Sequence, residues 1–160
     1  MHTAVFIEII FDSESVNTKA MLKTPSLCNC TNMRRASRAI THLYDELLAP
    51  SGLKVTQYSL LNHLKRLGPL TMQEFSQAIR LERTTLVRNL KPLEKMGLIR
   101  ITAEENSQAN KVHITEQGLR SLAAAAPYWE QAQQYITEVL TEEEMSVLLR
   151  AVQKIESLVP

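Results

Sequence analysis

The chain has 160 residues, of which 44% are hydrophobic, 22% charged and 5% aromatic, a composition typical of a soluble globular protein. No apolar run is long enough to cross a bilayer, so we expect a cytoplasmic, single-domain protein without a membrane span. The formal net charge of +1 conceals an asymmetry, because residues 54–100 hold nine basic and three acidic residues whereas 101–160 hold four and nine. The middle of the chain is therefore a cationic block that would attract a polyanion, nucleic acid first of all.

Two helices are predicted ahead of this block. The first starts near Leu27, repeats apolar residues with the i, i+3, i+4, i+7 spacing and stops in "APSG" at residues 49–52, where proline and glycine disfavour a helix. Thr56 is the predicted N-cap of the second helix, which ends at the Gly-Pro pair 68–69. Residues 1–26 do not fit this plan, and their role is open.

A helix-turn-helix pattern follows. Thr71 and Glu74 have the spacing of a capping box, in which each side chain accepts from the other residue's backbone amide, so a short helix should begin at Met72. The pattern breaks at residues 80–82, and the stretch "LERTTLVRNLKPLEKMGLIR" then predicts a second helix that ends before Gly97. Two helices joined by a tight turn, the second one cationic, are typical of DNA-binding proteins.

The second of these helices has two distinct faces at 100° per residue. Leu86, Leu90 and Leu93 fall on one side. The opposite side holds polar or cationic residues and a proline, flanked by Thr85 and Asn89: Thr84, Arg88, Lys91, Pro92 and Lys95. Such a helix suits the major groove, where arginine can donate to guanine, a threonine methyl can contact a thymine methyl and lysines can neutralise phosphates.

The C-terminal half is predicted to contain a hairpin and two helices. "LIRIT" and "VHIT" alternate apolar and polar residues around a long polar tip, which makes a winged helix of the preceding pattern. A long helix begins at Thr115 and contains Pro127, which should kink or interrupt it. Thr141 opens a second capping box, and the last helix carries a wide apolar stripe: Met145, Leu148, Leu149, Val152, Ile155 and Leu158.

The run from "LERTTLVRNLKPLEKMGLIR" through the polar tip to "HITEQG", together with "RRASRAITHLYDELLAPSGLKVTQYSLL", resembles the MarR (multiple antibiotic resistance regulator) family over about residues 27–158. The resemblance implies a mainly α fold with a small β-hairpin, a winged helix-turn-helix with N- and C-terminal dimerisation helices. Residues 53–115 would bind DNA, and residues 27–49 and 116–160 would form a homodimer on a palindromic operator. The two amphipathic ends are apolar enough to need such a partner.

Carried over onto this sequence, the resemblance assigns the DNA contacts. Arg83, Thr84, Thr85 and Arg88 would face bases or phosphates, with Lys91 and Lys95 on the DNA backbone. At the wing tip, where the family typically has an Asp-Arg-Arg-like triplet, this chain has Asn106, Ser107 and Gln108, with Lys111 as partial compensation. We therefore expect weaker and less salt-sensitive binding than in a typical member, with the helix carrying most of the recognition.

The family resemblance also implies a small anionic or phenolic effector bound between the dimer helices and the DNA-reading lobe. Arg38, His42 and Tyr58 are the candidate lining residues, although the ordinary interpretation of His42 is a structural histidine. Binding would act by a different affinity for two spacings of the recognition helices.

Cys28 and Cys30 precede the first helix with one residue between them. They could form a strained local disulfide, pair across a dimer or join a thiolate metal site, while free cytosolic thiols are the commonest outcome. Arg34, Arg35 and the helix N-terminus would lower a nearby thiol pKa, so redox sensing stays a hypothesis.

The sequence contains no metalloprotease motif, phosphate-binding glycine loop or plausible catalytic triad. We therefore predict neither an enzyme nor a bound cofactor or metal. The favoured function is that of a homodimeric, sequence-specific transcriptional regulator, and more specifically a repressor, that responds to a small molecule or a redox signal. The alternative is a winged-helix module for protein interaction or dimerisation that does not bind DNA.

Overall fold

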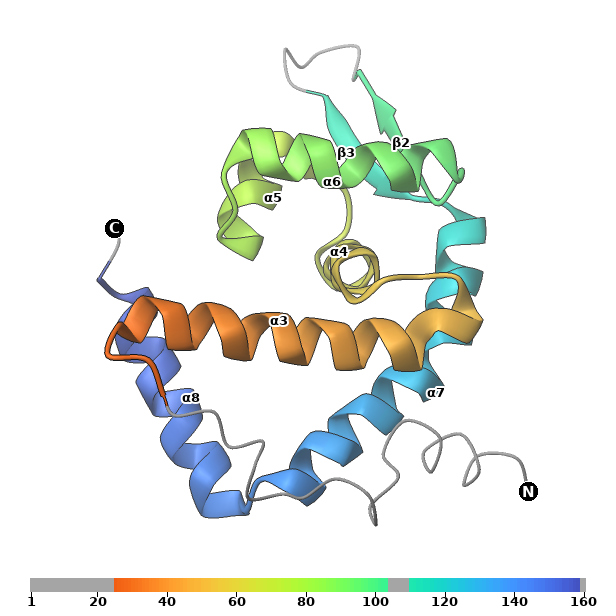
Figure 1. Cartoon of the computed structure of the whole chain (residues 1–160). Coiled ribbons are helices and arrows are strands. Elements are labelled where there is room, and N and C mark those ends of the chain that lie inside the picture. Colours follow the sequence, from red (N-terminus) through yellow and green to blue (C-terminus); the bar gives the residue numbers. More distant parts are fainter. Residues whose placement is uncertain (1–24, 104–109, 159–160) are drawn as a thin grey trace, which may run out of the picture. The chain divides into compact units, whose positions relative to one another are not determined.

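The computed structural model describes residues 25–103 and 110–158 (Figure 1). The chain divides into two units, residues 1–38 and 39–160, and helix α3 (Asn29–Leu48) passes from one into the other. In the first unit, the Ser26 amide donates to Asn32 Oδ1 over 2.8 Å, and the Asn32 side-chain amide donates to the Ser26 carbonyl over 2.8 Å. These paired bonds fix the chain where α3 begins, close to the predicted start.

In the second unit, α3 ends in a single turn of 3-10 helix, Ala49–Ser51, followed by Gly52 at φ 74°. Helix α4 (Val55–Leu67) comes next, with Lys54 rather than the predicted Thr56 at its N-cap. The helix starts earlier because other side chains satisfy its first amides. Gln57 Oε1 accepts from the Lys54 amide over 2.9 Å, and Asp45 Oδ1 accepts from the Val55 amide over 2.8 Å.

The helix-turn-helix consists of α5 (Met72–Ile79) and α6 (Arg83–Lys95). The capping box is present, since the Glu74 amide donates to Thr71 Oγ1 over 3.2 Å and the Thr71 amide donates to Glu74 Oε2 over 2.8 Å. Arg80 ends α5 in the left-handed region at φ 53°. Helix α6 continues through Pro92 to Lys95, as the sequence predicted.

The wing belongs to a three-stranded antiparallel sheet of β1 (Leu70–Thr71), β2 (Ile99–Thr102) and β3 (Lys111–Ile114), in the order β1-β3-β2. The sequence predicted only the β2-β3 hairpin. A strand of two residues that runs directly into a helix cap shows no alternation of its own, and it forms because β3 offers a free edge. Leu70 pairs with Val112 and Thr71 with Lys111.

Two helices complete the chain. Thr115 caps α7 (Glu116–Val139) by accepting from the Gly118 amide over 3.0 Å, and α7 continues through Pro127. Thr141 caps α8 (Glu142–Glu156) through a second capping box. Figure 1 shows α7 leading away from the sheet and α8 returning towards the helix-turn-helix. No helix within the described ranges is long and apolar enough to cross a membrane.

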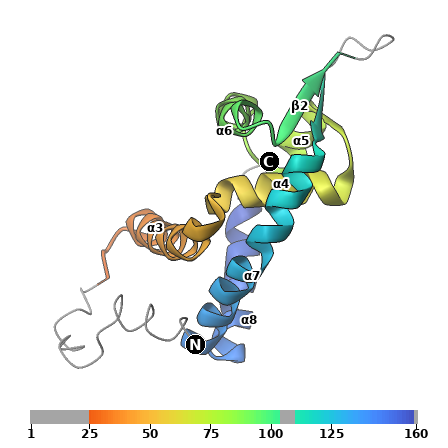
Figure 2. The same cartoon turned by 90° about the vertical axis from the view of Figure 1, so that its right-hand side faces the viewer.

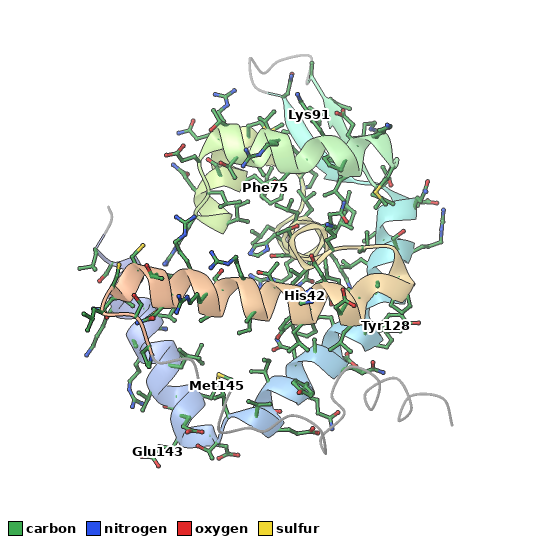
Figure 3. All side chains as sticks on the ribbon, viewed as in Figure 1. His42, Phe75, Lys91, Tyr128, Glu143 and Met145 are labelled. Carbon is green, nitrogen blue, oxygen red and sulfur yellow. The ribbon has the colours of Figure 1, made fainter. Side chains whose placement is uncertain are left out.

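The core lies between α4, α5, α6, α7 and the sheet, as Figure 3 illustrates with Phe75 on the inner side of the lobe. Its buried side chains come from every one of these elements: Leu48, Leu53, Tyr58, Leu60, Leu61, Leu64, Phe75, Leu86, Leu90, Leu93, Leu98, Ile99, Val112, Leu122 and Ala125. Helix α8, by contrast, has no buried residue. The predicted fold, a mainly helical winged helix-turn-helix with a small β-hairpin, is confirmed.

Candidate nucleic-acid interface

Helix α6 is held to the core by one face and presents the other to solvent. Leu86, Leu90 and Leu93 are almost completely buried, and together they fix the rotation of the helix about its axis. The opposite face holds the exposed residues Thr84, Arg88, Lys91 and Lys95, while Thr85 and Asn89 are half-buried at its margins. Arg83, the first residue of the helix, is also exposed. Figure 2, which looks almost along α6, shows the helix at the edge of the lobe, and Figure 3 shows Lys91 on the side next to the wing.

The N-terminal end of α6 adds a second attraction for anions. Glu82 occupies the N-cap position without a side-chain hydrogen bond to the helix. The first backbone amides of α6 therefore remain available to a phosphate oxygen, next to the exposed guanidinium of Arg83. Cationic side chains and the positive end of the helix dipole thus act on the same region of the surface.

The C-terminal end of α6 is fixed to the start of α7. Gly97, at φ 71°, turns the chain after α6, and its carbonyl accepts from the Thr115 hydroxyl over 2.7 Å. The Gln117 side-chain amide donates to the Met96 carbonyl over 3.3 Å. The residue that caps α7 therefore also holds the turn that follows the recognition helix.

The strands of the wing carry one candidate contact in the described part of the chain. Lys111 lies at the start of β3 opposite Thr71, and its charge helps to lower the pKa of the Glu74 carboxyl. The larger causes of that lowered pKa are the Thr71 amide and hydroxyl, which both donate to the carboxylate.

The predicted tip contacts Asn106, Ser107 and Gln108 lie outside the described residues. The strands that lead to the tip are described, and Thr102 Oγ1 and His113 Nε2 are hydrogen-bonded across them at 2.9 Å. This contact joins β2 to β3 near the end of the hairpin that leads to the tip. The assignment of the tip stays a prediction.

The three predicted effector residues have different surroundings. Tyr58 is buried and stacks on Trp129, with ring centroids 5.6 Å apart and an angle of 17° between the rings, so its ring is part of the core. In the single chain the His42 side chain is 77% exposed, and its Nδ1 lies 3.7 Å from Glu46 Oε1. Arg38 belongs to the other unit, where it lines a groove with Met33, Arg34 and Ser37.

Cys28 and Cys30 are both exposed free thiols. The pKa of Cys28 lies below its usual value because the side chain and backbone amide of Thr31 hydrogen-bond to the sulfur. The direction agrees with the expectation from the sequence, but the cause is this local hydrogen bonding and not the arginines of α3. A lowered pKa leaves more of the Cys28 side chain as thiolate, the reactive form, near neutral pH.

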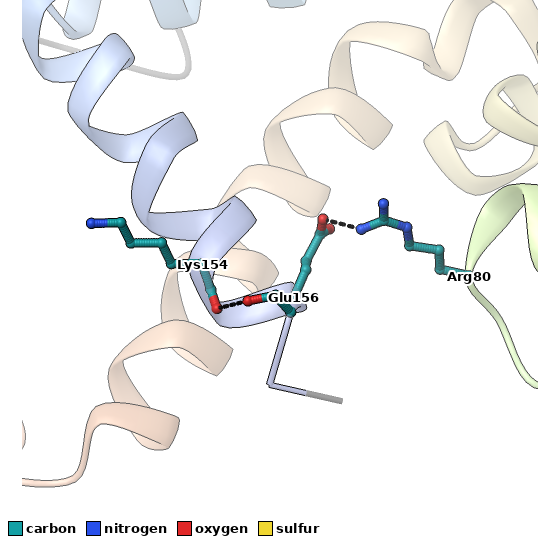
Figure 4. A network of polar contacts seen from close by, with 4 residues as sticks. Arg80, Lys154 and Glu156 are labelled. Atoms are coloured by element: carbon teal, nitrogen blue, oxygen red, sulfur yellow. Dashed lines mark hydrogen bonds and ion pairs between the residues drawn. The ribbon is translucent and has the colours of Figure 1, made fainter. Parts of the chain in front are cut away.

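An ion pair next to the start of α6 was not predicted from the sequence. The Arg80 guanidinium, in the turn between α5 and α6, forms an ion pair with Glu156 Oε2 in the last turn of α8, at 2.5 Å (Figure 4). The sequence pattern placed Arg80 only within a helix break. One feature of the sequence could have drawn attention to Arg80. The helix break at residues 80–82 contains neither glycine nor asparagine, the residues that usually adopt a left-handed conformation at the end of a helix.

Comparisons with known proteins agree with this geometry. A sequence profile described as "MarR family" matches residues 51–108. The transcriptional regulator MosR of M. tuberculosis is 32% identical, and the match covers 82% of this chain and 98% of MosR at a TM-score of 0.70. MosR has also been solved in complex with DNA, at a TM-score of 0.72, with 83% of this chain and 99% of that chain covered.

Two further proteins extend the comparison. The uncharacterized HTH-type transcriptional regulator YwoH of Bacillus subtilis (strain 168) is 29% identical over 85 residues, which are 53% of this chain and 62% of YwoH. The matched part is thus less than two thirds of that relative. The oxidized form of MarR from E. coli is similar in fold, with a TM-score of 0.64 at 19% identity, and the match covers 82% of this chain and 96% of that one.

Proposed function

The chain belongs to the MarR family, and we propose that it is a DNA-binding transcriptional regulator that acts as a homodimer. The observation that carries this proposal is the exposed face of α6, where Thr84, Arg88 and Lys91 are accessible while three leucines anchor the opposite face, with Arg83 exposed at the start of the helix. Arginine and threonine on a groove-sized helix can distinguish base pairs, and lysine at its margin can neutralise phosphates. MosR, at 32% identity, has been solved with DNA.

The proposed dimer rests on the apolar surface of α8. One stripe along α8 consists of apolar side chains that are exposed in the single chain: Leu148, Leu149, Val152 and Ile155. A stripe of this kind normally faces another helix, and a second copy of the chain would supply an identical one. Two subunits related by a twofold axis would place two α6 helices on a palindromic operator.

We further propose that the regulator is a repressor and that a small anionic or phenolic effector, or oxidation of its thiols, releases it from DNA. The redox route has a specific observation in its favour. Cys28 is exposed, its thiol pKa is lowered by hydrogen bonds from Thr31, and Cys30 is close to it in sequence. A thiolate reacts with oxidants where a thiol does not. Arg38, His42 and Tyr58 remain proposed effector contacts, with Tyr58 the least accessible.

The deciding experiment is selection of bound fragments from the native genome, followed by affinity measurements on a recovered duplex. Arg88→Ala should weaken binding by roughly 1–3 kcal/mol per bidentate base contact and relax the preference at one base pair of each half-site. Arg150→Ala, which removes an exposed arginine of α8, is the matched control and should bind as the wild type does. Recovery of no specific fragment would favour the alternative of a protein-interaction module.

A further inference from the structure

We propose that Arg80 and Glu156 are a pair of positioning residues that set the N-terminal end of the recognition helix α6 relative to the C-terminal helix α8. This inference rests on the proposed function of α6 in reading DNA. The two residues are 76 positions apart in the chain, and their ion pair connects the turn of the helix-turn-helix to the last turn of α8 (Figure 4).

The backbone of Arg80 is the first reason to assign it such a task. In the described residues it is the sole non-glycine residue with a positive φ, at 53°. Glycine would adopt this conformation without steric conflict, whereas a residue with a Cβ is strained there. The Arg80 amide donates to the Gln77 carbonyl and the Leu81 amide to the Ser76 carbonyl, so the conformation is held by the turn itself. Arg80 thus has a backbone conformation that glycine would adopt more easily. The interaction of its guanidinium with Glu156 would explain why an arginine is present there.

The surroundings of the pair give the second reason. A groove of about 370 Å³ opens between α4 and the α5-α6 turn, lined by Ser59 and Leu60 of α4, Ile79 and Leu81 of the turn region, and both Arg80 and Glu156. The groove borders the turn before α6, whereas Leu86 in the first turn of the helix is fully buried. A turn that borders open space can shift, while packed side chains would resist the same displacement. The ion pair spans this less constrained region.

The two ends of α6 are consequently held in different ways. The C-terminal end is fixed by the Thr115 hydroxyl on the Gly97 carbonyl and by α7, which packs directly against Leu98. At the N-terminal end, Leu86 packs into the core, and the turn that precedes the helix is connected to α8 by an ion pair whose side chains are 73% and 48% exposed. Any displacement of α8 would thus act on the N-terminal end of α6, the end that carries Arg83, Thr84 and Thr85, with the Gly97 turn as the pivot.

The test compares Arg80→Gln, Glu156→Gln and the charge swap Arg80→Glu/Glu156→Arg in the full-length protein. Gln keeps the left-handed backbone strain of Arg80 while removing the charge. Each single variant should bind the selected duplex about fivefold more weakly, because the surface ion pair is absent from both subunits, and the swap should recover most of the affinity. Glu142→Gln, at the other end of α8, is the control and should leave binding unchanged.

Two results would overturn the proposal. If Arg80→Gln weakens binding, Glu156→Gln does not and the swap fails to recover it, Arg80 contacts DNA directly; if neither single variant changes binding, the pair has no positioning role. Hydrogen exchange of the Arg80 and Leu81 amides, measured without DNA, tests the ion pair independently of DNA binding. It therefore distinguishes a pair without a positioning role from a protein that does not bind DNA. Both single variants should exchange faster there and the swap should restore protection, even if no operator is found.

Discussion

Gly118 of α7 lies so close to the backbone of Leu98 that a Cβ atom on the glycine would stand 2.1 Å from the Leu98 carbonyl oxygen. The same atom would stand 2.8 Å from Cγ1 of Ile114. The absence of a side chain therefore allows the first turn of α7 to pack directly on the chain that follows the recognition helix. Together with the Thr115 hydroxyl on Gly97, this contact joins the start of α7 closely to the end of α6.

Gly118→Ala should destabilise the protein, in contrast to the usual effect of this change within a helix. Helix propensity alone would favour alanine by about 1 kcal/mol. Here the added methyl has no space against a backbone atom, and overpacking of this kind costs about 1–3 kcal/mol. Urea unfolding measures the difference, and Ala123→Gly, at an exposed position of the same helix, measures the propensity contribution alone. A Gly118→Ala protein more stable than the wild type would contradict the close approach.

Much of this fold could be predicted because local signals and tertiary structure agree. Both capping boxes, at Thr71 and Thr141, start helices where the sequence indicated, and the leucines of α6 are buried on the predicted face. Thr56 was the wrong cap because Gln57 and, ten residues before Val55, Asp45 satisfy the first amides of α4 instead. A bond between distant residues leaves no pattern in a local window.

The features of the candidate site also fall into two groups, those that a local sequence pattern predicts and those that depend on tertiary structure. Exposure of Thr84 and Arg88 follows from helical periodicity, so the sequence could predict it, whereas Arg83 was assigned from the family resemblance. Strand β1 and the ion pair between Arg80 and Glu156 could not be predicted, because each depends on which segments the folded chain brings together. Similarly, Tyr58 was assigned to a binding surface from its position on α4, but the ring of Trp129 covers it.

Val152→Glu should convert the proposed dimer into monomers. Val152 is 37% exposed and lies at the centre of the apolar stripe of α8. A carboxylate there would be buried without a partner in each subunit, which should raise the dimer dissociation constant by at least about tenfold. Sedimentation velocity over a range of concentrations measures the change.

Val147→Glu is the matched control for this experiment. It introduces the same side chain at an exposed position of the same helix, 50% accessible, but five residues from Val152 and therefore on a different face. It should leave the dimer intact. If both variants dissociate equally, or if neither does, the stripe is not the interface.

Lys91→Gln should weaken DNA binding without changing which sequences are preferred. Lys91 is exposed on the side of α6 next to the wing, where a phosphate contact supplies affinity but no base discrimination (Figure 3). The slope of log affinity against log salt should become shallower by about 0.9 for each phosphate that is no longer neutralised. Fluorescence anisotropy at several salt concentrations gives the slope, with Lys154→Gln of α8 as the control. An altered base preference would show that Lys91 reads bases.

The capping boxes predict a pH dependence of stability. The pKa of Glu74 is lowered by the Thr71 amide and hydroxyl and then by Lys111, and that of Glu144 by the Thr141 amide and hydroxyl. A lowered folded-state pKa stabilises the protein above the unfolded-state pKa, and this stabilisation is lost as the pH falls through the folded-state value. The free energy of unfolding should therefore decline between about pH 6 and pH 3.

In the double variant Glu74→Gln/Glu144→Gln this decline should be shallower, because glutamine keeps an acceptor for the capping amide at every pH. Urea unfolding at a series of pH values measures it. Glu130→Gln, an exposed carboxyl within α7, should retain the wild-type slope. A double variant with the full wild-type decline would mean that the loss of stability in acid arises elsewhere.

Thr31→Val should make Cys28 less reactive near neutral pH. The Thr31 side chain is the largest cause of the lowered Cys28 pKa, followed by the Thr31 amide, and valine keeps the shape of threonine without its hydroxyl. The thiolate is the reactive form, so a higher pKa leaves less of it at pH 7. Iodoacetamide labelling in a Cys30→Ser background should slow at pH 7 and become equal to that of the parent at alkaline pH, where both thiols are ionised. Equal rates at every pH would show that Thr31 does not control the reactivity of Cys28.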